Sequence, residues 1–144
     1  MESPERLRSL PSWLSGQVAL RAERLVSEAL AEAGVRRHHF TVLTALAEQG
    51  ATSQAQLGRR LWLDRSDLHA VLGDLERAGL VARVRDEADR RRNLVELTPA
   101  GTEELVRLDE RVEAAQDALL APLSAQERAA LVALLARVVT YHRA

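Results

Sequence analysis

The stretch from Leu63 to Thr98 constrains the possible folds of this chain most, because it joins an amphipathic helical pattern to two short strand-like runs. Apolar residues at the spacing i, i+3, i+4 and i+7 form one stripe on a predicted helix: Leu68, Val71, Leu72 and Leu75. Asp64 is suited to be the N-cap of this helix, and Gly79 is suited to its C′ position. One face of the helix is therefore predicted to be buried and the other to face solvent.

Two β-type runs follow this helix, from Leu80 to Val84 and from Leu94 to Leu97. The charged segment between them contains Asp and Asn residues, which suit a hairpin loop. Before the helix, Ser53 and Gln56 have the spacing of a capping box and predict a further short helix with Leu57 and Leu61 on its buried face. Two helices with a tight connection, followed by a basic hairpin, indicate a winged helix-turn-helix.

Long helical patterns lie on both sides of this region. Residues 5 to 33 are predicted to form one helix that ends at Gly34, and residues 36 to 49 a second that ends at Gly50. After the hairpin, Thr98 and Pro99 suit the start of a fifth helix, and a capping box of Ser124 and Glu127 suits the start of a last one. The predicted fold class is mainly α with a small β-hairpin wing, in a single domain of residues 1 to 144.

The fifth helix carries a short coiled-coil-like seam, made by Leu105, Leu108, Val112, Ala115 and Leu119. The first helix has an apolar surface that is wider than one stripe, because Trp13 and Leu20 extend it. We expect this surface and the seam to bury each other across a two-fold axis. Periodicity alone leaves a monomeric helical bundle open as the alternative.

Composition excludes several classes of function. The chain has no cysteine, which removes disulfides, cysteine-ligated zinc and thiol-based sensing of oxidants. Its four histidines are scattered, and the sequence contains no phosphate-binding glycine loop and no nucleophile motif, so no metal site, cofactor or enzymatic activity is expected. No apolar run is long enough to span a membrane and the N-terminus lacks the pattern of a signal peptide, so a cytoplasmic location is expected.

Charge gives only weak support for nucleic-acid binding, because the net charge is −1. Between Ser53 and Asn93, nine arginines stand against seven acidic residues, whereas the rest of the chain carries more acidic than basic residues. All twenty basic residues of the chain are arginines. The local excess has the sign that DNA binding requires but is too small to establish it.

The segments DRRRNLVELTPAG and LERAGLVAR resemble the wing and the end of the recognition helix in the MarR family of transcriptional regulators. The resemblance extends over most of the chain, from about Leu10 to His142. It implies a homodimer in which residues 7–33 and 99–142 form the dimerisation helices and residues 36–97 form the winged helix-turn-helix. It also implies a regulator, most often a repressor, that binds a pseudo-palindromic operator and releases it on binding a small molecule. A winged helix that binds other proteins and not DNA is the alternative.

Four residues at the start of the recognition helix are candidates for contacts in the major groove: Arg65, Ser66, Asp67 and His69. Arg65 can bind guanine or phosphate, and Asp67 can accept from cytosine, pair with Arg65 or support the helix N-terminus. His69 and Ala70 replace residues that in many members of the family are a hydroxyl and a basic side chain.

Four residues of the wing are further candidates: Asp89, Arg90, Arg91 and Arg92. Arg91 matches the position that the family inserts into the minor groove, where Asp89 would orient it by a charge-assisted bond. Arg90 and Arg92 are interpreted either as phosphate contacts or as part of a solvated loop.

The resemblance also implies an effector site between the dimerisation helices and the winged helix. Our candidates are Trp13, His38 and Phe40, although Trp13 and Phe40 are equally suited to the core or an interface. A small aromatic acid would suit a pocket that offers His38 together with Arg36 or Arg37.

Overall fold

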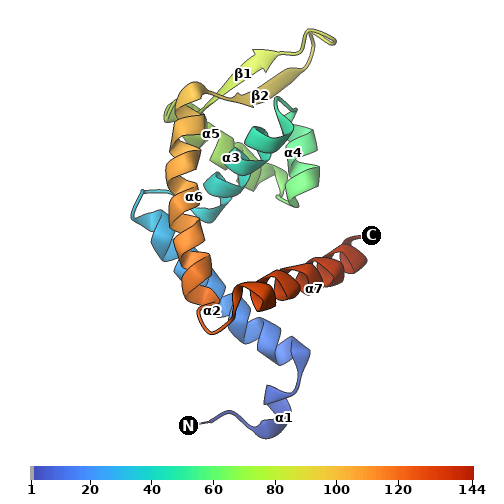
Figure 1. Ribbon diagram of the computed structural model, residues 1–144. Helices are drawn as coiled ribbons and strands as arrows, with labels where there is room; N and C mark the ends of the chain where they lie inside the picture. The colour runs from blue at the N-terminus through green and yellow to red at the C-terminus, as the bar shows by residue number, and fades with distance from the viewer. Residues whose placement is uncertain (1) are drawn as a thin grey trace. The chain divides into compact units, whose positions relative to one another are not determined.

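The computed structural model describes residues 2–144, which form seven helices and one two-stranded sheet (Figure 1). The helices are α1 (Glu5–Arg8), α2 (Pro11–Ala31), α3 (Arg37–Gln49), α4 (Gln54–Leu61), α5 (Arg65–Arg77), α6 (Pro99–Leu119) and α7 (Ala125–Arg143), and the strands are β1 (Val81–Arg85) and β2 (Asn93–Leu97). This confirms the expected fold class. By its contacts the chain divides into two compact units, one of Val26–Glu113 and one of the residues up to Leu25 together with Ala114–Ala144.

The unit Val26–Glu113 is built around one hydrophobic core. The predicted stripe of α5 is confirmed, because Leu68, Val71, Leu72 and Leu75 are at most 7% exposed. The other members of the core come from every helix of the unit and from both strands: Leu30, Val42, Leu43, Ala45, Leu46, Leu57, Val81, Val95, Leu105 and Leu108. Each fully buried leucine contributes about 1.5–3 kcal/mol relative to an exposed one, so this core supplies most of the stability of the unit.

One prediction about α6 is wrong. Leu105 and Leu108 are 8% and 0% exposed and belong to the core of a single chain, and Val112 packs against the same core. Leu105 and Leu108 are therefore not available for the seam of a dimer, whereas Val112 is half-buried. The error arises because periodicity identifies a face that is buried but says nothing about which chain covers it.

The helix-turn-helix consists of α4 and α5. Ser53 and Gln56 form the predicted capping box at the start of α4, and Asp64 caps α5 as predicted. Between the two helices, the backbone of Trp62 has a φ of 58°, in the left-handed region that residues other than glycine and asparagine rarely adopt. This residue ends α4 sharply and allows the chain to turn into α5.

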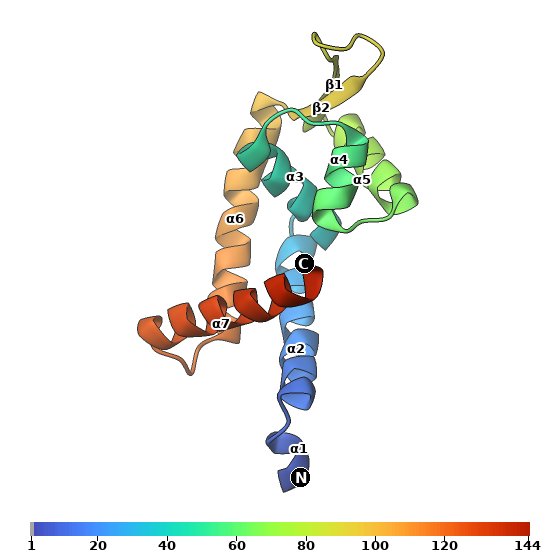
Figure 2. The ribbon, with the colours of Figure 1, turned by 90° about the vertical axis from the view of Figure 1, so that its right-hand side faces the viewer.

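The wing is an antiparallel hairpin in which Val81 pairs with Leu97 and Arg85 pairs with Asn93. It projects beyond α3, α4 and α5 of the same unit (Figure 1, Figure 2). Its start is fixed by a Schellman motif after α5, because Gly79 has a φ of 75° and the Leu80 N–H donates to the Leu75 carbonyl at 2.9 Å. The sequence did not predict that Thr52, ahead of α4, would form a β-bridge with Val95 and extend the sheet on its other side.

The first turn of α6 is fastened to the base of the wing by Thr98. Its hydroxyl donates to the Gly79 carbonyl at 2.7 Å and accepts from the Gly101 N–H at 3.0 Å, while its N–H donates to the Leu80 carbonyl at 3.0 Å. Gly101 is buried, and a Cβ at this position would overlap with the Leu80 carbonyl oxygen. The helix can approach the wing this closely only because residue 101 is a glycine.

The second unit contains α1, the part of α2 up to Leu25, the end of α6, and α7. The prediction of one helix over residues 5 to 33 is wrong, because α1 ends at Arg8 and α2 begins at Pro11. A proline has no N–H to bond to the preceding turn and its ring clashes there, so a helix can begin at Pro11 but cannot run through it. The capping box of Ser124 and Glu127 at the start of α7 is confirmed.

This second unit leaves much apolar surface uncovered. No residue of α7 is buried. The exposed apolar side chains lie on α2 and α7, with exposed fractions of 43% or more: Leu14, Val18, Leu20, Val132, Leu134, Leu135, Val138, Val139 and Tyr141. Because an apolar surface of this extent is uncommon on a monomer, it indicates a surface that another molecule covers.

Candidate nucleic-acid interface

The solvent face of α5 carries the four residues that sequence analysis selected on the recognition helix. Arg65, Ser66, Asp67 and His69 are all exposed, and they lie in the first turns of α5, away from its buried stripe. The N-terminal turns of a helix that inserts into the major groove are the ones whose side chains reach base edges. The fold thus presents all four residues on a surface that a DNA duplex could contact.

The Asp64 carboxylate organises the N-terminus of α5. Its Oδ1 accepts from the Asp67 backbone N–H at 2.8 Å and from the Ser66 hydroxyl at 2.8 Å. The first of these bonds, with the second adding to it, lowers the pKa of the Asp64 carboxyl below its ordinary value. The carboxylate therefore stays charged at neutral pH, favours the positive end of the α5 dipole and orients the Ser66 hydroxyl toward itself.

Asp67 adds a second carboxylate to the first turn of α5. Among residues 2–144 it makes no ion pair with Arg65, so of its two structural interpretations the structure favours support of the helix N-terminus. Because no carboxylate of the described chain neutralises Arg65, its guanidinium is available to an external acceptor.

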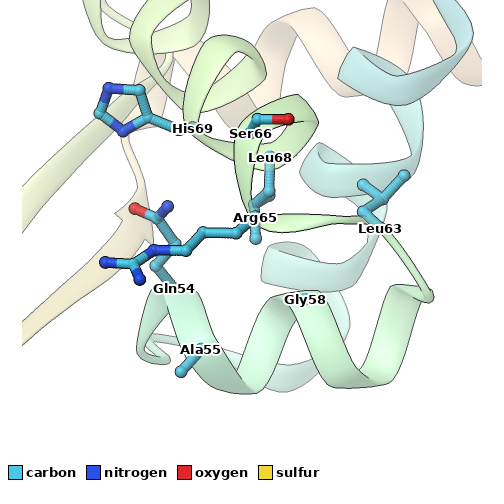
Figure 3. Close-up of a pocket in the computed structure, with 8 residues that line it drawn as sticks. All are labelled: Gln54, Ala55, Gly58, Leu63, Arg65, Ser66, Leu68 and His69. Atoms are coloured by element: carbon cyan, nitrogen blue, oxygen red, sulfur yellow. The ribbon is translucent and has the colours of Figure 1, made fainter.

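An open hollow of about 1010 Å³ lies between α4 and the start of α5. Gln54 and Ala55 of α4 line it together with Arg65 and His69 of α5. Figure 3 shows the Arg65 side chain extending past Gln54, with the His69 ring on the same side of the hollow. Sequence analysis missed Gln54, which lies at the first position of α4; its place directly after the Ser53 cap was the signal that could have identified it.

The wing loop is shaped by two aspartates that bond to the main chain. Asp86 Oδ1 accepts from the Ala88 N–H at 3.0 Å, and Asp89 Oδ1 accepts from the Arg91 N–H at 3.1 Å. We expected the Arg91 guanidinium to donate a charge-assisted bond to Asp89, and this is corrected by the structure: the Asp89 carboxylate accepts from the backbone N–H of Arg91. Asp residues commonly do this in Asx-turns, where the side chain takes the place of a main-chain acceptor.

The arginines of the wing loop remain unpaired. Arg90, Arg91 and Arg92 are exposed, and within residues 2–144 none of them forms an ion pair. The acidic residues of the second half of α5 are occupied instead, because Glu76 pairs with Arg83 of β1 at 2.6 Å and Asp74 pairs with Arg77 at 2.5 Å. The wing tip and the start of α5 thus carry arginines without an ion pair among the described residues, and the same holds for Arg59 and Arg60 at the end of α4.

The candidate effector residues do not gather in one unit. Trp13 lies on α2 in the unit that contains α7, whereas His38 and Phe40 lie on α3 in the unit Val26–Glu113. Phe40 packs against the hydrophobic core of its unit, and His38 is half-buried. Their role in binding a ligand stays a prediction.

Residues 2–144 contain no group of three or more His, Cys, Asp or Glu side chains that could hold a metal ion. Across the same residues, none of the helices has the length and apolarity needed to cross a membrane.

Comparisons with known proteins agree with this geometry. A family model described as the MarR family matches residues 33–92. A putative transcriptional regulatory protein for the hcr operon of Thauera aromatica is 33% identical over 105 residues, which are 73% of this chain and 63% of the relative. This chain thus spans slightly less than two thirds of the length of that curated relative.

Solved structures match nearly the whole chain. The PcaV transcriptional regulator of Streptomyces coelicolor, in complex with its natural ligand, is 33% identical with a TM-score of 0.72 and covers 97% of this chain and 98% of its own. A mutant MarR of E. coli complexed with operator DNA is 27% identical with a TM-score of 0.78 and covers 94% and 99%. The fold, the hairpin wing and these similarities together show that this chain belongs to the MarR family of transcriptional regulators.

Proposed function

We propose that this chain is a sequence-specific DNA-binding regulator that acts as a homodimeric repressor and releases its operator when a small organic molecule binds. The observation that carries the proposal is that one unit presents Arg65 at the start of α5 and three arginines on the wing tip, all exposed and without an ion pair among residues 2–144. The MarR of E. coli, solved with operator DNA, has the same fold over nearly its whole length.

In this proposal α5 enters the major groove. Arg65 binds guanine or a phosphate, and His69 and Ser66 reach neighbouring base edges or phosphates. Asp67 accepts from a cytosine amino group where the operator provides one. The Asp64 carboxylate already accepts from the Asp67 N–H, so that amide is not available for a phosphate, and in this proposal the side chains supply most of the affinity.

The wing enters the minor groove through Arg91. The negative potential of a narrow minor groove favours a guanidinium, and Arg90 and Arg92 on either side are placed to contact phosphates. Asp89 contributes by fixing the turn that presents Arg91.

The homodimer is supported by the exposed apolar side chains of α2 and α7, which lie in the unit that contains α7. A second copy of the chain is the partner most often found for such a surface, and a two-fold axis matches a pseudo-palindromic operator. The two half-sites are then expected at a spacing of about one helical turn, or roughly 10 bp.

The proposed effector is a small aromatic acid. PcaV was solved with its natural ligand, which supports small-molecule control for a chain of this fold. Trp13, His38 and Phe40 remain the candidate residues, and Trp13 and His38 are each tested alone by substitution to alanine. Loss of DNA release by an aromatic acid in at least one of the Trp13→Ala and His38→Ala variants is the expected result. Release by peroxide or zinc, or an unchanged response in both variants, would contradict the assignment.

DNA binding is tested by selecting a preferred duplex from a random library and measuring its affinity by fluorescence anisotropy over a range of salt. We expect affinity to fall steeply with salt, and Arg91→Ala to lose about 1–3 kcal/mol with little change in the melting temperature. Arg107→Ala is the matched control, because it removes the same charge from α6, where Arg107 pairs with Glu104 at 2.7 Å.

Two outcomes would contradict the proposal. If no duplex is retained at low salt, the winged helix serves contacts with other proteins. If Arg91→Ala and Arg107→Ala reduce affinity equally, the wing acts only through net charge and does not enter the groove.

A further inference from the structure

His39 uses both of its ring nitrogens, and it bonds to two different elements. Its Nδ1 accepts from the Arg36 backbone N–H at 3.0 Å, which caps the start of α3. Its Nε2 lies 2.9 Å from Asp74 Oδ2 in the second half of α5. The His39 side chain is 12% exposed, whereas that of Asp74 is 49% exposed.

The two bonds together define the state of the ring. An Nδ1 that accepts from a backbone N–H carries no proton, so the hydrogen of the neutral ring is on Nε2 and is donated to Asp74. The other oxygen of Asp74 accepts from Arg77 at 2.5 Å. The bond from His39, with that from Arg77 adding to it, lowers the pKa of the Asp74 carboxyl, which is therefore charged when it accepts.

This bridge supplies a restraint that the hydrophobic core of the unit does not. The stripe of α5 is held against α3 by burial of apolar surface, a driving force that has no preferred direction. A hydrogen bond is lost when its distance or angle changes by a modest amount. His39 therefore ties the axial position and rotation of α5 to the first turn of α3.

We propose that His39 is a positioning residue for DNA reading, because it fixes α5 in the position from which its N-terminal side chains reach the bases. The inference rests on the proposed function, since it needs α5 to be the reading helix. His39 itself does not touch the DNA in this account. It acts through Asp74 and the rigid helix between Asp74 and Arg65.

The test separates the capping bond from the bridge. In His39→Glu the carboxylate at the third helical position remains a good acceptor for the Arg36 N–H, but it repels Asp74. In His39→Gln the amide offers both an acceptor and a donor. The double variant His39→Glu with Asp74→Asn restores a donor opposite the new carboxylate, so it rebuilds the bridge with its polarity reversed.

We expect His39→Glu to weaken binding of the selected duplex about 3- to 10-fold, as is typical for coupled residues in contact, while its melting temperature stays close to that of the parent. His39→Gln and the double variant are expected to recover most of the affinity. Equal affinity of His39→Glu and the parent, or a double variant no better than His39→Glu, would overturn the proposal, because a residue that only caps α3 gives that result.

The tautomer is measured independently of DNA by NMR of the protein labelled with ¹⁵N at histidine. The expected spectrum has a protonated Nε2 and an unprotonated Nδ1 for His39, and Asp74→Ala is expected to remove this preference. A proton on Nδ1 in the parent would overturn the bridge. If the parent binds no duplex, the proposed function fails, and the NMR result still decides whether the bridge exists.

Discussion

Replacing Gly101 by alanine should destabilise the protein, whereas the same replacement at Gly73 should not. A Cβ at Gly101 would overlap with the Leu80 carbonyl oxygen and lie 2.8 Å from Leu97 Cδ1, closer than real Cβ atoms approach. A Cβ at Gly73 would meet only the far end of the long Arg77 side chain, at 3.3 Å. Gly73 is inside α5 and Gly101 is in the first turn of α6, so alanine gains at most about 1 kcal/mol of helix propensity at either position.

The size of the effect follows from what must move. To relieve the overlap, the first turn of α6 has to withdraw from the wing base, which strains or breaks the two bonds from Thr98 to the Gly79 and Leu80 carbonyls. Each such bond contributes about 1 kcal/mol, and overpacking of a tight site costs about 1–3 kcal/mol. After the gain in helix propensity, Gly101→Ala is expected to lose about 2–4 kcal/mol, while Gly73→Ala gains up to about 1 kcal/mol.

The assay is urea denaturation followed by circular dichroism, at one fixed protein concentration because a dimer unfolds in a concentration-dependent way. The parent, Gly101→Ala and Gly73→Ala are compared through their midpoints and slopes. A Gly101→Ala variant as stable as the parent would refute the reasoning. It would mean that α6 can withdraw from the wing without losing any interaction.

Three further predictions follow. Because the pKa of the Asp64 carboxyl is depressed in the folded state, its contribution to stability is present above about pH 4 and is lost as the pH falls through the folded pKa. Asp64→Asn keeps a helix cap that does not titrate, so its melting temperature should fall less than that of the parent on acidification. Melting temperatures that fall equally with pH in both proteins would contradict this. Val138→Glu should shift sedimentation from dimer to monomer at micromolar concentration, whereas Ala129→Glu, on the opposite face of α7, should not. Asp89→Asn should bind the selected duplex like the parent and Asp89→Ala more weakly, since the bond is to the Arg91 backbone; equal losses would show that the charge matters instead.

Features of the fold that depend on neighbouring residues were predictable from the sequence. The caps at Ser53, Asp64 and Ser124 and the C′ glycine at Gly79 are formed as expected. Each is decided within one helical turn, by a side chain that satisfies a free backbone N–H or by a residue that tolerates a positive φ. The family resemblance likewise rested on a short segment, and the comparisons confirm it.

Features that depend on distant parts of the chain were not predictable in the same way. The bridge of Thr52 to Val95 and the burial of Leu105 and Leu108 are decided by what lies opposite them in space. The break before Pro11 was a local signal that the apolar periodicity of residues 5 to 33 concealed. In the candidate site, Asp89 was predictable as a residue of the wing, but the acceptance of the Arg91 backbone N–H by its carboxylate was not.

The two tryptophans of the sequence lie in different units, Trp13 on α2 and Trp62 in the turn between α4 and α5. Trp62 is 62% exposed and directly precedes Leu63, which lines the hollow beside Arg65. The protein thus carries one tryptophan in each unit. In Trp13→Phe the tryptophan emission reports on the helix-turn-helix as DNA approaches. In Trp62→Phe it reports on the unit with the exposed apolar helices as protein concentration is lowered. Events at the two units can be followed by light emission without attaching any label.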